Sequence, residues 1–336
     1  MRFLVAAHHT PWQVGLSCKR ALQELGHQAD LFYLNASKNI WEKFINGLRP
    51  RIRHAGPYID MVWERLINRQ LIQRVSDARV DVLLVIRGEE LYKETLREIR
   101  HRHKTRVVTW WTEPSLERKY YPKSLAEFDF VFTFDRAHIP KIKEYGAKYA
   151  DYLPLACDPF IHKQIALNAD QKHYYGHDVS FCGAINLARI DVFKTISDFD
   201  FAIRGKDWPR IVKREGLSKN FKGEIKGEDV ARVYNASKIA LNVHHPDNIS
   251  GANARTFEIP ACGTLEIVDY KTSIGELFVV GKEIICYKDK REIRGLIQYY
   301  LSHPEEREEI AGRGYERVHK EHRYIDRMQY ILSVLR

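Results

Sequence analysis

The sequence predicts an α/β protein with two doubly wound, parallel-sheet (Rossmann-like) domains. Short apolar runs alternate with helical segments along nearly the whole chain. Several runs consist almost wholly of Val, Leu, Ile and Phe, which is typical of strands in a parallel sheet covered on both faces. The length of 336 residues favours two domains over one. Ligands of such domains bind beyond the carboxyl ends of the strands, so we expect a site in the cleft between them.

The first half of the chain contains six predicted strands with helices between them. Helices are predicted at 17–26, 89–102 and 136–146, and the last two end in a basic turn or in glycine, as helix C-termini do. The strands are RFLVAA (2–7), ADLFYL (29–34), VDVLLVI (80–86), RVVTWW (106–111), DFVFTF (129–134) and YADYLPL (149–155).

Residues 156–177 do not continue the alternation of apolar runs and helical segments, and we predict that they link the two domains. We place the domains at 1–160 and 176–320. The alternation then restarts, and the chain ends in helical sequence. The strands predicted in the second half are DVSFCG (178–183), DFAIRG (200–205), IALNVHH (239–245), TLEIVDY (264–270) and EIICYK (283–288).

Composition and charge narrow the class of protein. The chain carries 44% hydrophobic residues, 29% charged residues and a formal charge of +10, so its surface attracts anions such as nucleic acid, membrane lipids or phosphorylated small molecules. No apolar run approaches the roughly 20 residues that span a bilayer, and the first apolar stretch is too short for a signal peptide, so we expect a cytoplasmic protein. The five scattered cysteines favour free thiols over disulfides or a zinc site.

The stretch SGANARTFEIPACG (250–263) is the strongest candidate for a binding site. We expect Ser250 and Gly251 to lie at a helix N-terminus, where free N–H groups favour a phosphate. Arg255 adds a positive charge with bidentate geometry, and Glu258, one turn later, suits paired sugar hydroxyls. The stretch therefore predicts a site for a nucleoside diphosphate. The alternative is an internal Arg–Glu ion pair at i, i+3, which would stabilise the helix only weakly.

The span LNVHHPDNISGANARTFEIPACGTLEIVDY (241–270) resembles the donor-site signature of GT-B glycosyltransferases. Asn253, Arg255, Phe257 and Glu258 resemble the CgeB-like members, which are named for a spore maturation protein. Further segments are similar to the same family. They are VDVLLVIRGEEL (80–91), VVTWWTEPS (107–115), VSFCGAINLARIDVF (179–193), FAIRGKDWPR (201–210) and the tail at 276–318.

The resemblance implies a GT-B fold in which the last helix, 321–336, packs back on the first domain. It implies a glycosyltransferase that moves a sugar from a nucleotide sugar, expected to be a UDP-sugar, to a hydroxyl acceptor of a surface or spore glycan. It also implies that Gly183, Arg189, Asn253 and the RGK segment, with Arg204 and Lys206, line the donor side. Arg189 and Lys206 then neutralise the leaving diphosphate in place of a metal, so we expect no metal and no cofactor besides the nucleotide sugar. Solvated helix charges are the alternative for both residues.

One departure from the family pattern leaves the stereochemistry open. Many retaining GT-B enzymes carry two glutamates separated by seven residues. If Glu258 is the second of them, Ser250 occupies the first position. Glu266 has the right distance from Glu258 but falls inside the following strand, so we interpret this pair as a coincidence.

The first domain is expected to supply the acceptor side and the general base. HHTPWQVG follows the first strand, so His8, His9 and Gly15 are predicted at the cleft, with Gly15 counted among the donor-binding residues. His9 is the first candidate base, because its ordinary pKa lies near neutrality. Glu113 and Asp135, each at the carboxyl end of another strand, are its rivals, and a histidine merely hydrogen-bonded in a loop is the alternative.

The segment 38–74 is basic and contains interleaved aromatic residues. It suits an anionic membrane surface at the inner face of the membrane, or nucleic acid, or it is a solvated face. A nucleic-acid-binding protein, or a glycosyltransferase acting on nucleic acid, is therefore the alternative function.

Overall fold

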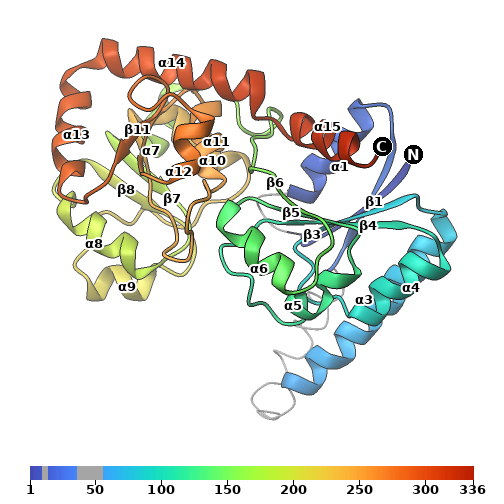
Figure 1. The fold of residues 1–336 in the computed structure, drawn as a ribbon. Helices are drawn as coiled ribbons and strands as arrows, with labels where there is room; N and C mark the ends of the chain where they lie inside the picture. The colour runs from blue at the N-terminus through green and yellow to red at the C-terminus, as the bar shows by residue number, and fades with distance from the viewer. Residues whose placement is uncertain (10–13, 36–55) are drawn as a thin grey trace. The chain divides into compact units, whose positions relative to one another are not determined.

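A computed structural model describes residues 1–9, 14–35 and 56–336 (Figure 1). The predicted basic segment 38–74 lies partly outside these ranges. The chain divides into two compact units. Unit 1 consists of Met1–Pro154 and Met328–Arg336, and unit 2 of Leu155–Arg327.

Unit 1 is built on a six-stranded sheet of order β2-β1-β3-β4-β5-β6, in which all neighbouring strands are parallel. The order places β1 between β2 and β3, so the direction of strand addition reverses there. The strands are β1 (Arg2–Ala7), β2 (Gln28–Tyr33), β3 (Val82–Ile86), β4 (Arg106–Trp111), β5 (Phe130–Thr133) and β6 (Ala150–Tyr152).

Helices cover both faces of this sheet. One face packs against α3, α4, α5, η1 and α6, with Leu71, Leu96 and Ile142 in a common core. The other face carries α1 and α15, where the Tyr330 ring lies 6.2 Å from that of Phe132. The helices are α1 (Val14–Glu24), α3 (Gly56–Ala78), α4 (Lys93–Arg102), α5 (Tyr121–Ser124), η1 (Leu125–Glu127), η2 (Arg136–His138), α6 (Ile139–Glu144) and α15 (Tyr324–Val334).

Unit 2 is built on a five-stranded sheet of order β11-β10-β9-β7-β8, again with every neighbouring pair parallel. Its reversal lies between β7 and β9. The strands are β7 (Val179–Cys182), β8 (Phe201–Arg204), β9 (Ile239–Asn242), β10 (Leu265–Asp269) and β11 (Ile285–Tyr287).

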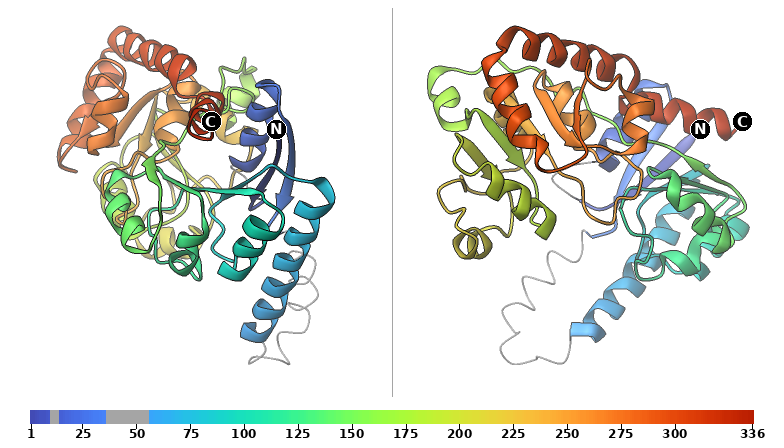
Figure 2. Two further views of the ribbon diagram at one scale, coloured as in Figure 1. Left: turned by 45° about the vertical axis from the view of Figure 1, so that its right-hand side comes forward. Right: turned by 60° about the vertical axis from the view of Figure 1, so that its left-hand side comes forward.

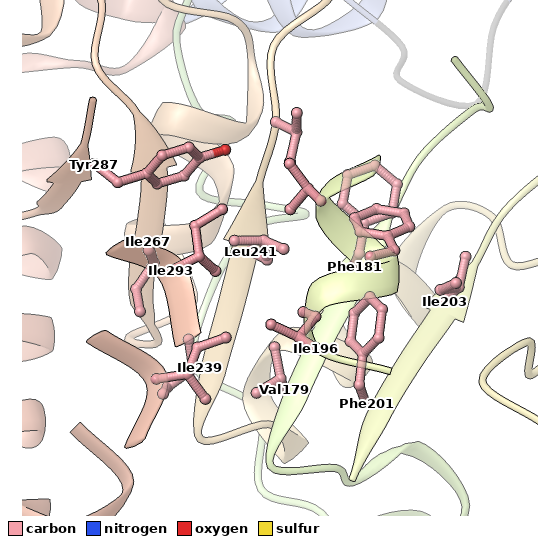
Figure 3. Packing of buried hydrophobic residues seen from close by; sticks show 14 of the residues in the cluster. Val179, Phe181, Ile196, Phe201, Ile203, Ile239, Leu241, Ile267, Tyr287 and Ile293 are labelled. Carbon is pink, nitrogen blue, oxygen red and sulfur yellow. The ribbon is translucent and has the colours of Figure 1, made fainter. Parts of the chain in front are cut away.

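The core of unit 2 joins one face of the sheet to helices α8, α9 and α13. Figure 3 shows Phe181, Leu241 and Ile267 of the strands packed with Ile293 of α13. The opposite face packs against α10 and α11, and α14 lies along α11. The helices are α7 (Ala169–Tyr175), α8 (Leu187–Thr195), α9 (Pro209–Arg214), α10 (Glu228–Ala236), α11 (Arg255–Ala261), α12 (Thr272–Leu277), α13 (Glu292–Ser302) and α14 (Pro304–Glu321).

The predicted fold class is confirmed, since each of the eleven predicted runs contains or overlaps a strand of the two parallel sheets. Three local predictions differ from the structure. The helix predicted from residue 89 begins at Lys93, and α3, which runs beside α4 (Figure 2), was not predicted. The segment 156–177 contains α7, whose first turn is closed by a capping box between Asn168 and Gln171.

Within unit 2, the segment that begins the unit pairs with the segment that ends it. Cys157 donates its N–H to the carbonyl of His322 at 2.9 Å, and Tyr324 donates to the carbonyl of Cys157 at 3.2 Å. The Arg327 guanidinium donates to the carbonyl of Leu155 at 3.2 and 3.0 Å. These bonds hold the two ends of the unit together. Among the described residues, no helix combines the length and the apolar character that crossing a membrane requires.

His322 makes the stability of this junction dependent on pH. Its Nδ1 lies 3.0 Å from Nη2 of Arg327 and accepts from it, so the proton is on Nε2, which lies 3.0 Å from the carbonyl of Leu277. Burial, together with the charge of Arg327, lowers the pKa of His322 to about 4. The unfolded chain, with an ordinary histidine pKa near 6.5, therefore binds the proton first as the pH falls.

We expect this group to remove about 2 kcal/mol of stability between roughly pH 7.5 and pH 5, since the stability it contributes is present above its unfolded pKa and is lost below it. His322→Gln keeps an amide donor for Leu277 but does not titrate. Urea unfolding at the two pH values should show a larger loss for the wild type than for the variant. Equal losses in the two proteins would contradict the assignment.

Candidate functional site

The strand order of unit 2 marks the place in its sheet where ligands of such folds bind. At the reversal between β7 and β9, the loops that follow the two strands leave in opposite directions, and ligands bind outside the carboxyl ends of the strands there. β7 ends at Cys182 and β9 at Asn242. The side chains around these two ends are therefore the candidates.

Arg255 lies directly over Gly183. Its Nε donates to the carbonyl of Cys182 at 2.6 Å, and its guanidinium lies 5.3 Å from the centre of the Phe181 ring. A side-chain carbon on Gly183 would collide with Nη2 of Arg255. The carbonyl of Gly183 accepts from the indole N–H of Trp208 at 2.8 Å. A side chain at position 183 would therefore have to displace the Arg255 guanidinium.

A second guanidinium, that of Arg189, is buried beside the first. It donates to the carbonyl of Val243 at 3.1 and 2.9 Å and to that of Ala184, and it lies 5.0 Å from the Phe181 ring. Burial, together with the charge of Arg255, lowers the pKa of Arg189 to about 8. Among the described residues, no carboxylate lies within 4.0 Å of either guanidinium. An anion bound here would lower the electrostatic energy of both arginines.

Glu258 lies one helical turn after Arg255 and is 3% exposed. Its Oε1 is 3.8 Å from Nε2 of His162, and its Oε2 is buried without a hydrogen-bond partner. Arg255 and Glu258 form no ion pair with each other. The alternative interpretation of this stretch, an internal ion pair at i, i+3, is therefore wrong. A buried carboxylate oxygen without a donor is costly, and a ligand hydroxyl would satisfy it.

Asn253 belongs to a polar network behind Arg255. Its side chain exchanges hydrogen bonds with Asn242 at 3.0 and 2.9 Å, and Asn242 also donates to Glu266 at 2.8 Å. Burial raises the pKa of Glu266 well above its ordinary value. His244 accepts from the N–H of Asn253 at 3.1 Å. Asn253, predicted as a donor ligand, thus binds other side chains of the unit.

The predicted helix start at Ser250 and Gly251 is wrong by several residues, since α11 begins at Arg255. Just before the helix, the Asn253 Oδ1 accepts the Arg255 N–H at 2.9 Å in a local turn, and the N-cap residue itself, Ala254, has no capping side chain. The carbonyls of Ser250 and Gly251 accept hydrogen bonds from the Ser273 N–H and from the Asn248 side chain.

Two further residues, Arg204 and Lys206, were predicted on the donor side. Arg204 donates to the carbonyls of Lys222 at 2.9 Å and Tyr174 at 2.6 Å, and its guanidinium lies 4.9 Å from the Tyr174 ring. It therefore ties α7 to the end of β8. Lys206 is exposed in the loop that follows β8.

The reversal point of unit 1, between β1 and β3, also carries a polar cluster. Nε2 of His8 lies 2.7 Å from Oε1 of Glu90, which is 6% exposed. Burial raises the pKa of Glu90, but the contact with His8 outweighs this and leaves the pKa below its ordinary value. His9, the predicted base, is exposed, and its backbone N–H and carbonyl bind the Asn35 side chain at 2.7 and 3.1 Å.

Glu113, the rival base, is paired with an arginine. Nη1 of Arg87 lies 2.9 Å from Oε1 of Glu113, and Nη2 lies 2.6 Å from Oε1 of Glu89. Arg87 adopts a φ of 70°, a left-handed conformation that costs energy for any residue except glycine. The backbone strain and the two carboxylates together fix this guanidinium at the carboxyl end of β3.

Two other predicted residues have structural partners in unit 1. Gly15 lies in α1 against Ala7 of β1, where a side-chain carbon would collide with the alanine. Asp135 is fully buried, and its carboxylate accepts the N–H of Ala137 at 3.0 Å to cap η2.

Potential metal ligands converge at one place among the described residues. Ligand atoms of His8, Glu89 and Glu90 lie within 4.8 Å of one another. Glu89 is held by two hydrogen bonds from Arg87, at 3.1 and 2.6 Å. The positive charge of that arginine opposes a cation at the same place.

Sequence reasoning missed several polar residues at the two reversal points. His244 with Asp269, His162 beside Glu258, and Glu90 beside His8 were not predicted as site residues. Each lies at or shortly beyond a strand end or in the segment entering unit 2, which is a weak signal. Their partners come from distant parts of the chain, so only the folded chain identifies the pairs.

The geometry can now be compared with known proteins. Residues 189–333 match the family model described as glycosyl transferase-like. The spore protein CgeB of Bacillus subtilis (strain 168) is 22% identical over 227 residues, which cover 62% of this chain and 69% of that protein.

Two solved structures share the fold over the whole chain. Sucrose-phosphate synthase from Thermosynechococcus elongatus has a TM-score of 0.69 at 12% identity, covering 99% of this chain and 98% of its own. Anabaena HepE in complex with UDP and glucose has a TM-score of 0.67 at 12% identity, covering 100% of this chain and 99% of its own.

The two parallel sheets and the solved structures show the GT-B fold, and the family match supports a glycosyltransferase. The similarity to CgeB supports the CgeB-like resemblance found in the sequence. The comparisons give no support for the nucleic-acid alternative.

Proposed function

We propose that this enzyme transfers a sugar from a UDP-sugar to a hydroxyl acceptor, with unit 2 holding the donor. The observation that carries the proposal is the pair of guanidiniums of Arg189 and Arg255, which share the Phe181 ring and have no carboxylate within 4.0 Å among the described residues. A diphosphate supplies the missing negative charge. The complexes of Anabaena HepE with UDP and with UDP-glucose support uridine as the nucleoside.

In this proposal Glu258 binds the ribose of the donor, and Arg189 and Arg255 bind its diphosphate. Glu258 accepts hydrogen bonds from the ribose hydroxyls, which satisfies its unpartnered Oε2. The two arginines stabilise the charge of the leaving diphosphate, so the transfer needs no catalytic metal or other cofactor.

We assign the acceptor side to unit 1, with His8 as the general base. Nε2 lies 2.7 Å from Oε1 of the buried Glu90, and we assign the other ring nitrogen, Nδ1, as the proton acceptor. The relation to a spore protein supports a surface or spore glycan as the acceptor.

We also propose a peripheral contact with anionic lipid through α3. Val62 and Leu66 on this helix are 61% and 41% exposed, and the exposed Arg65 and Arg69 lie beside them. An exposed helix face with apolar and basic residues suits the interface of an anionic membrane. The remainder of the predicted basic segment, 38–55, lies outside the described residues.

The first test is calorimetric titration of UDP in the presence of EDTA. Wild-type protein is expected to bind UDP without metal, and Arg255→Gln to bind it roughly ten- to hundredfold more weakly, because a charged hydrogen-bond partner of the phosphates is lost. Arg294→Gln is the matched control, since Arg294 pairs with Asp198 before the amino end of β8. Absence of UDP binding to wild-type protein, or unchanged binding to Arg255→Gln, would refute the proposed donor site.

The second test concerns the ribose. Glu258→Ala should weaken UDP binding by about 1.5–3 kcal/mol, because the ribose hydroxyls lose a charged acceptor. A 2′,3′-dideoxy analogue of UDP cannot make these bonds with either protein. Wild-type protein should therefore discriminate between UDP and the analogue, whereas the variant should bind the two nearly alike. A variant that still discriminates as well as wild type shows that Glu258 does not bind the ribose.

The third test separates the two adjacent histidines by following UDP release from UDP-glucose with water as the acceptor. His8→Asn is expected to lower kcat by roughly 10²–10⁴-fold without weakening UDP binding, because it removes the general base but no donor contact. His9→Asn tests the base predicted from the sequence. If His9→Asn lowers kcat and His8→Asn does not, the base is His9 and the pairing with Glu90 is only structural.

A further inference from the structure

The position of Arg255 is set by a histidine deeper in unit 2. The side chain of His244, which follows β9, is fully buried, and its two ring nitrogens have different partners. Nδ1 lies 2.8 Å from Oδ1 of Asp269, and the backbone N–H of Asn253 donates to Nε2 at 3.1 Å. Since Nε2 accepts a hydrogen bond, the proton of the neutral ring is on Nδ1, with Asp269 as its acceptor.

Asn253 connects this ring to Arg255. The Asn253 Oδ1 accepts the N–H of Arg255 at 2.9 Å and thereby fixes the first residue of α11. The other side-chain atom of Asn253, Nδ2, donates to Asn242 at 2.9 Å. His244 and Asn242 thus hold the loop before α11 through Asn253, while the Arg255 side chain extends over Gly183.

We infer that His244, held by Asp269, is a positioning residue for the diphosphate-binding arginine of this enzyme. It acts through Asn253, whose backbone N–H it accepts and whose side chain accepts the backbone N–H of Arg255. The inference rests on the proposed function, in which Arg255 binds the diphosphate. His244 itself touches no ligand in this assignment, so its loss weakens the contact with phosphate and spares the contacts with the nucleoside.

The charged groups that face His244 explain why the ring is neutral. Asp269 attracts a proton to it, whereas Lys271, whose Nζ is 3.8 Å from Oδ2 of Asp269, and Arg255 oppose protonation. Burial is the largest effect and lowers the pKa of His244 below 6.5. A protonated ring has no acceptor at Nε2, so the bond to Asn253 breaks as the pH falls through that lowered pKa.

The experiment compares UDP with uridine on two variants of the full chain. His244→Leu removes the acceptor and should weaken UDP binding about tenfold, while uridine binds as to wild type. His244→Gln places an amide oxygen where it can accept from Asn253 and should stay within about threefold of wild type for UDP. The neighbouring His245→Ala is the matched control, because the His245 side chain is 45% exposed and lies beside Asp247.

A pH series gives a readout that a merely structural role would not change. The ratio of the UDP dissociation constants of wild type and His244→Gln cancels the ionisation of UDP itself. The ratio should be constant above pH 6.5 and should rise at lower pH, because only the wild type loses its acceptor there.

The outcomes separate this inference from the proposed function. Wild-type protein that binds no UDP refutes both. If wild type binds UDP, the inference alone fails when folded His244→Leu binds UDP as tightly as wild type, when His244→Gln loses as much affinity as His244→Leu, or when uridine and UDP lose affinity equally. Thermal unfolding of each variant shows that the folded protein is compared.

Discussion

The candidate donor site depends on one contact, in which the guanidinium of Arg255 lies across the backbone at Gly183. Burying a charge costs several kcal/mol unless hydrogen bonds replace the lost water, and here backbone carbonyls at the strand ends supply them. Cys182 accepts from Arg255, and Val243 and Ala184 accept from Arg189. These carbonyls are available because the chain leaves β7 and β9 in opposite directions at the reversal of the sheet. The strand order therefore creates the site that the two arginines occupy.

Carbonyl partners hold the arginines but do not neutralise them. A carboxylate in the same place would satisfy the charge and remove the affinity for an anion. Two carboxyl groups near the two arginines are bound to other side chains. Glu266, a buried carboxyl of β10, accepts from Asn242 and has its pKa raised by burial, and Asp269 is paired with His244. The hydrogen bonds among these polar side chains therefore fix the loop before α11 and leave the positive charge of the two arginines without a carboxylate partner among the described residues.

The sequence predicted the fold well because parallel strands buried on both faces form continuous apolar runs, which are hard to mistake. It failed where side chains override backbone propensity. The small-residue loop indicated a helix start at Ser250, whereas α11 begins at Arg255, directly after the turn in which Asn253 accepts the Arg255 N–H. His8 and His9 are equivalent in the sequence, and only the fold brings one of them to Glu90 from another strand. Arg204 was placed on the donor side, but its partners in α7 lie thirty residues earlier in the chain.

Contacts with other parts of unit 2 also explain why Arg255 and Glu258, three residues apart, do not pair with each other. In an isolated helix, opposite charges three residues apart attract each other, yet here each side chain is held toward a different neighbour, Cys182 or His162. Both groups therefore retain an unused binding capacity, positive charge on one and a buried acceptor oxygen on the other. A ligand that satisfies both must present an anion and hydroxyl donors about one helical turn apart, roughly 5 Å. A nucleoside diphosphate does so, whereas the repeating phosphates of a nucleic acid would place negative charge against the Glu258 carboxylate.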